Sequence, residues 1–102
     1  MGLAAAGLAL ALSASAFAQD PARHGRALLT EFCARCHSIG KTGRSQHVSA
    51  PPFRTLGRSF DLDQLPRRLE RGISSGHPDM PEFKFGEADA RAVRAYLYTI
   101  QE

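Results

Sequence analysis

The sequence has no tryptophan and only two cysteines, Cys33 and Cys36. At 102 residues the chain has room for one domain, and a domain of this size buries too little surface to be comfortably stable without a further constraint. Two cysteines form at most one disulfide, which excludes a disulfide-rich scaffold. The remaining ways to stabilise the domain are a bound metal, a large covalent cofactor or association with another chain.

The cations form no cluster along the chain. The formal charge is +3, and eleven of the thirteen Lys and Arg residues are arginines, but these are scattered and never form the basic run expected of a nucleic-acid arm. We therefore expect no nucleic-acid partner. With 43% hydrophobic and 23% charged residues, the composition is that of a folded globular domain and not of a disordered chain.

Residues 1–18 contain no charged side chain. They hold a Leu/Ala-rich run from Leu3 to Leu12 and end in Ala16-Phe17-Ala18, a small-x-small cleavage site. We interpret 1–18 as a signal peptide cleaved near Ala18, which leaves 19–102 as one periplasmic domain. An uncleaved anchor is the alternative, because the uncharged stretch almost reaches the ~20 residues of a spanning helix. No later segment has that character, so the mature protein should not contact a membrane.

No stretch alternates as a β-strand does, and apolar residues recur instead at helical spacing. The pattern predicts an all-α domain. We expect one helix from Pro21 into Cys33, a second from Asp63 to Gly72 or Gly76, and a third over 87–101. Two loops, 38–59 and 74–85, separate them. Loops this long in so small a domain are usually functional.

The chemistry lies in Cys33-Ala34-Arg35-Cys36-His37, a C-x-x-C-H motif typical of covalent haem attachment. In a helical turn, residues i, i+3 and i+4 share one face, so two thiols can reach the two vinyl groups of one haem while an imidazole meets the iron. Thiol-redox sites and zinc sites also use C-x-x-C. The former requires a βαβ context, which is absent here, and the latter a second ligand pair. Zinc would have to complete its coordination from the histidines, His24, His37, His47 and His77.

One haem iron has two axial positions, and the motif assigns His37 to one of them. Met80 is our prediction for the other, because Pro78 and Pro81 stiffen the loop that presents it and thioether ligation suits an electron carrier. His77 is the rival ligand, and would give bis-histidine coordination with a lower potential. A third possibility leaves the position open to a small ligand.

Over residues 20–102 the sequence resembles the class I c-type cytochromes, bacterial monohaem members in particular. The resemblance implies a cytochrome c-like fold, with three principal helices plus loops around one covalently bound haem c. It implies that Gly25 lets the terminal helices approach closely, with Tyr96 packed against it. It also implies that the carbonyl of Pro51 accepts a hydrogen bond from His37, although Pro52 could serve instead.

The expected function is one-electron transfer, and we expect no enzymatic activity of the chain alone. Redox proteins would dock transiently at an exposed haem edge, steered by a cationic rim. The alternative is a haem subunit bound permanently to an oxidoreductase such as a dehydrogenase. The sequence does not determine the oligomeric state. Candidate rim residues are Arg35, Lys41, Arg44 and Lys84. Candidate core or pocket residues are Leu28, Leu29, Phe32, Phe53, Leu56, Leu65, Leu69, Ile73, Phe83, Phe85, Val93 and Leu97.

Overall fold

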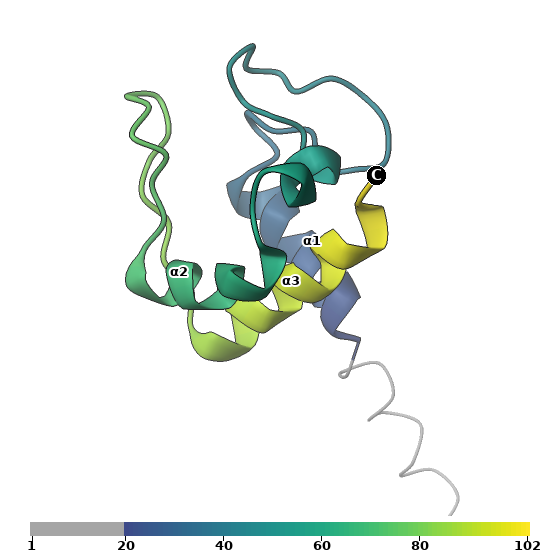
Figure 1. Cartoon of the computed structure of the whole chain (residues 1–102), viewed down its shortest axis with the longest axis vertical. Coiled ribbons are helices and arrows are strands. Elements are labelled where there is room, and N and C mark those ends of the chain that lie inside the picture. The colour runs from purple at the N-terminus through teal and green to yellow at the C-terminus, as the bar shows by residue number, and fades with distance from the viewer. Residues whose placement is uncertain (1–19) are drawn as a thin grey trace, which may run out of the picture.

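A computed structural model describes residues 20–102, so the expected signal peptide and its cleavage near Ala18 lie outside the described residues. Within this range the secondary structure is helical, which confirms the predicted all-α class (Figure 1). No helix of the described range combines the length and the hydropathy needed to cross a bilayer. The elements in chain order are α1 (Pro21–Phe32), η2 (Phe53–Arg58), η3 (Leu62–Gln64), α2 (Leu65–Arg71) and α3 (Glu87–Ile100).

Helix α1 begins at a well-formed N-cap. The carboxylate of Asp20 accepts a hydrogen bond from the backbone N–H of Arg23, and Pro21 occupies a first-turn position that needs no N–H partner. The helix ends at Cys33, whose N–H donates to the carbonyl of Leu29. The haem-attachment motif therefore starts where α1 stops.

Helix α3 packs against both α1 and α2 and carries much of the core. Its apolar stripe faces inward, and two acidic residues lie in its first turn, where the positive end of the helix dipole favours them. The buried residues of the core are Leu28, Leu29, Leu62, Leu65, Leu69, Ala90, Val93, Tyr96, Leu97 and Ile100.

The helices α1 and α3 meet at Gly25. A Cβ built on this glycine would lie 2.0 Å from the carbonyl oxygen of Ala92 and 3.0 Å from the Cβ of Tyr96. No side chain fits in this space, so the close approach requires glycine. This confirms the contact between Gly25 and Tyr96 expected from the resemblance.

Two details differ from the expected elements. The predicted loop 38–59 contains the 3-10 helix η2, and α2 begins at Leu65 instead of Asp63 because the preceding residues form the separate turn η3. Helix α2 ends at Gly72, whose φ of 106° is open to glycine and strained for other residues. The irregular segment that follows is closed at its base by one antiparallel bridge between Ile73 and Phe83. Figure 1 shows this segment and the loop after α1 extending from the same side of the helices.

Candidate functional site

A cavity of about 870 Å³ lies among the helices and the two long loops. Its walls are mainly apolar, and they include every predicted core or pocket residue except Leu28, which is buried elsewhere in the core. Three aromatic rings meet at one wall: Phe32 makes edge-to-face contacts with Phe83 and Phe85, at centroid distances of 6.4 and 5.5 Å. A large apolar cavity with a few polar groups is typical of a cofactor site.

The two thiols of the C-x-x-C-H motif line this cavity, and no disulfide joins them. A tight turn follows α1, in which the N–H groups of Cys36 and His37 both donate to the carbonyl of Cys33. Burial, and secondarily the proximity of Cys36, raises the pKa of the Cys33 thiol to about 11. Thiol–disulfide exchange sites instead lower the pKa of their nucleophile, so this environment does not favour the thiol-redox alternative.

His37 is oriented by the backbone of the next loop. Its Nδ1 lies 2.8 Å from the carbonyl oxygen of Pro51. A carbonyl only accepts, so Nδ1 carries the proton and donates it, and Nε2 keeps a free lone pair. The carbonyl of Pro52 instead accepts from Thr55, and the ring of Phe53 packs against the imidazole at a centroid distance of 4.5 Å.

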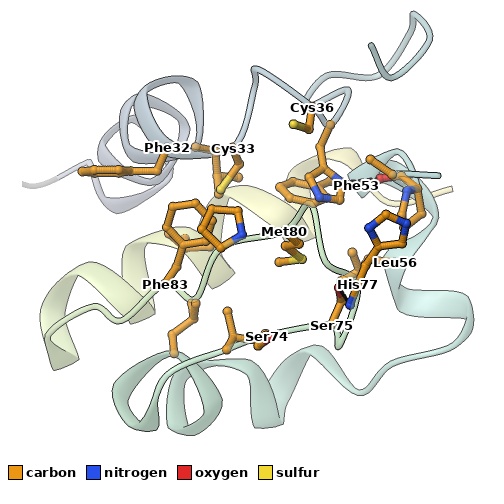
Figure 2. A pocket seen from close by; sticks show the side chains of 18 of the residues that line it. Phe32, Cys33, Cys36, Phe53, Leu56, Ser74, Ser75, His77, Met80 and Phe83 are labelled. Carbon is orange, nitrogen blue, oxygen red and sulfur yellow. Dashed lines mark hydrogen bonds between the residues drawn. The ribbon is translucent and has the colours of Figure 1, made fainter. Parts of the chain in front are cut away.

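Met80 lines the same cavity, and Figure 2 shows its side chain in the interior, between the loop that carries His77 and the two cysteines. Two histidines, His47 and His77, also line the cavity. His47 Nε2 lies 3.0 Å from Oδ2 of Asp79, and the backbone N–H of Asp79 donates to Nδ1 of His77 at 3.2 Å. His47, His77 and Asp79 lie at the edge of the cavity, close to one another.

All five site residues predicted from the sequence line this one cavity: Cys33, Cys36, His37, Pro51 and Met80. Of the candidate rim cations, Arg35 belongs to the lining and Lys41, Arg44 and Lys84 do not. His24 lies elsewhere, in a largely exposed pair with Asp89 that joins α1 to α3.

Among the lining residues to which the sequence did not point are Phe60, Arg68 and Asp79. Arg68 lies over the ring of Phe60, with Cζ 4.4 Å from the centroid, and so covers part of the wall with a cation–π contact. Arg68 directly precedes the buried Leu69 on α2, and this neighbour is the one local signal that could have indicated a place near the pocket. No local sequence signal indicated Asp79, because its hydrogen bond is to His47 in a loop that is distant in sequence.

The residues present fit a covalently attached haem. The volume lies in the ~300–1,000 Å³ range of cofactor sites. Two thiols, one imidazole with a free Nε2 lone pair and one thioether open onto the same apolar space. Cys33 and Cys36 would hold the group through thioether bonds, and His37 would bind its iron.

This fold and this site define the chain as a c-type cytochrome domain. A family model described as "Cytochrome C oxidase, cbb3-type, subunit III" matches residues 20–97, and the chain belongs to this family. Searches of the curated proteins and of the solved structures gave no match. The domain binds haem c with its iron and serves as an electron-transfer module that is not catalytic by itself. Cytochrome c domains of this family are typically extracytoplasmic.

Proposed function

We propose that this chain is a periplasmic monohaem cytochrome that carries single electrons between redox partners, with His37 and Met80 as the axial ligands of the iron. The observation that carries the proposal is the hydrogen bond between His37 Nδ1 and the Pro51 carbonyl, which leaves Nε2 available beside two thiols and a thioether. When bound, haem c supplies an iron that exchanges one electron at a time.

The hydrogen bonds of the histidines favour Met80 over His77 as the second ligand. The N–H of Asp79 donates to Nδ1 of His77, so the proton of the neutral His77 ring lies on Nε2. Binding iron through that nitrogen would require a tautomer change and the loss of this hydrogen bond. Met80 needs no such change, because a thioether carries no proton.

The remaining lining residues act by excluding water and by holding the ligands still. The Pro51 carbonyl fixes the orientation and the tautomer of the His37 ring, and Phe53 packs on the same ring. Apolar walls lower the local dielectric and so tune the potential. With haem bound, His37 and Met80 held in place by these contacts would keep reorganisation small in each electron transfer.

Optical spectra of the exported protein, oxidised and reduced, test the ligation. We expect a haem that survives denaturation and a ferric iron–sulfur charge-transfer band that Met80→Ala abolishes and His77→Ala retains. Absence of the band from the parent protein, or its persistence in Met80→Ala, would overturn the assignment. A colourless protein from cells competent in haem attachment would overturn the haem site itself.

The location needs a separate experiment, because the signal peptide interpretation rests on the sequence alone. We expect the mature protein in the periplasmic fraction with an N-terminus near Gln19. A mature protein that retains residues 1–18 and sediments with membranes would instead support the anchor.

The second candidate is a permanently bound haem subunit of a larger oxidoreductase. The family's description, which names a subunit of an oxidase, favours this candidate. A transient, charge-steered dock dissociates at high salt, because salt screens exposed charges. Co-purification of a second polypeptide at about 1 M salt, where the Debye length is only about 3 Å, would support the subunit over the free carrier.

A further inference from the structure

Two loops that are distant in sequence meet beside Met80. His47 belongs to the loop after the C-x-x-C-H motif, and Asp79 directly precedes Met80. Their side chains approach to 3.0 Å across 32 residues of sequence. His47 is the less exposed of the two, with 28% of its side chain accessible against 65% for Asp79.

This contact is the only hydrogen bond of the described chain that joins residues 74–82 to another segment. The bridge between Ile73 and Phe83 pins the base of the segment. The other hydrogen bonds of residues 74–82 lie within the segment itself, such as the one from the N–H of Met80 to the carbonyl of His77. The tip that carries Met80 therefore has one polar attachment to the rest of the domain.

The His47 end of this contact is itself hydrogen-bonded to the C-x-x-C-H motif. The backbone N–H of His47 donates to the carbonyl of Cys36 at 3.1 Å, which fixes the backbone of His47 against the motif. The N–H of Ser49 donates to His47 Nδ1 at 3.1 Å, so the proton of the neutral ring lies on Nε2. The Nε2–H of His47 donates to the carboxylate of Asp79.

The same tautomers disfavour a metal ion at this cluster. One ligand atom each from His47, His77 and Asp79 lies within 4.8 Å of the others, a spacing that could suit a metal. Both imidazoles, however, accept a backbone N–H at Nδ1, which leaves protonated Nε2 atoms where a metal needs lone pairs. The geometry favours a hydrogen-bonded link between loops.

We propose that His47 and Asp79 form a clasp that holds the Met80 loop closed over the cavity, so that both are positioning residues for Met80. This inference rests on the proposed ligation of the iron by His37 and Met80. The clasp opposes movement of Met80 away from the iron. Breaking the clasp makes the coordination position assigned to Met80 more accessible to an added ligand.

The test uses the ferric holoprotein and imidazole as the added ligand that displaces Met80. We expect His47→Ala and Asp79→Ala each to increase the apparent imidazole affinity about two- to fivefold, the range of a partly exposed ion pair. The double variant should show no larger increase in imidazole affinity than either single variant, because each single substitution already removes the same link. His47→Gln keeps a side-chain N–H donor, so its imidazole affinity should stay nearer to that of the parent.

The matched control is the second His–Asp pair, His24 with Asp89, at 2.7 Å and near the N-terminal ends of α1 and α3. Neither residue lines the cavity. His24→Ala should leave imidazole affinity unchanged while removing a hydrogen bond of the same kind. An equal increase in His24→Ala and His47→Ala would mean general loosening and would overturn the clasp.

Two other outcomes separate the clasp from the ligation on which it rests. If the parent shows the iron–sulfur band but His47→Ala and Asp79→Ala bind imidazole as the parent does, the clasp is wrong and the ligation stands. If the parent lacks the band and binds imidazole as Met80→Ala does, the ligation is wrong and the clasp falls with it.

Discussion

The hydroxyl of Tyr96 on α3 donates a 2.6 Å hydrogen bond to the carbonyl oxygen of Ile39, two residues after His37. The Cβ of the same residue lies against Gly25 at the crossing of α1 and α3. One side chain therefore joins the helix crossing to the segment that leaves the haem-attachment motif. The stability of the site and that of the helix pair are coupled through it.

Tyr96→Phe should lower the free energy of unfolding of the holoprotein by about 1–2 kcal/mol, because it removes a partly buried hydrogen bond and leaves the Ile39 carbonyl without that donor. Denaturant unfolding measures the effect. The control is Tyr98→Phe, which removes an exposed hydroxyl bonded to Asp63 and should cost less at pH 7. Equal losses in the two variants would contradict the role given to Tyr96.

Gly25→Ala should cost at least about 1–3 kcal/mol of unfolding free energy, because the new methyl would meet the backbone of Ala92 and force α1 and α3 apart. Gly40→Ala is the matched control. A Cβ there meets nothing closer than 3.9 Å, so its effect should stay within about 0.5 kcal/mol. Similar unfolding midpoints for Gly25→Ala and the parent would show that the helices do not cross as described.

The amide of Gln101 joins the end of α3 to η2. It donates to the carbonyl of Phe53 and accepts from the N–H of Gly57, each at 2.8 Å. Because Phe53 packs on His37, the amide also supports the proximal side of the site.

Gln101→Ala should therefore lower the unfolding free energy by about 1–3 kcal/mol, since two backbone groups lose their partner. Glu102→Ala, which removes ion pairs of the half-exposed Glu102 carboxylate with Arg54 and Arg58, should cost no more than about 1 kcal/mol. Denaturant unfolding of both holoproteins gives the comparison. A larger loss for Glu102→Ala would mean that the ion pairs, and not the amide, hold η2.

Local patterns in the sequence were sufficient for the helices and for the motif. The apolar spacing predicted α1 and α3 to within about two residues, and the C-x-x-C-H motif located the haem-attachment turn. The helix η2 was missed because its short 3-10 turn follows Pro51-Pro52 and contains Gly57, both of which read as loop signals.

The contacts between loops could not be predicted from local rules. His47 and Asp79 are 32 residues apart, and Gln101 and Gly57 are 44 apart. Helical periodicity relates residues three and four positions apart, and loop residues carry no comparable pattern. Which loop tips meet depends on how the helices pack, and that packing is a property of the whole chain.

The pair of Tyr98 and Asp63 should make stability depend on alkaline pH. The hydrogen bond to the Asp63 carboxylate raises the pKa of the Tyr98 phenol above its ordinary value of about 10. The folded state thus holds this proton more tightly than the unfolded state does. The contribution of the hydrogen bond to the unfolding free energy is therefore complete below about pH 10 and is lost as the pH rises through the folded-state pKa. We expect the difference in unfolding free energy between the parent and Tyr98→Phe to be constant from about pH 7 to 9 and to shrink above about pH 10. Other groups titrate alike in both proteins and cancel in this difference, so a difference that stays constant through pH 11 would show that the hydroxyl does not bind Asp63.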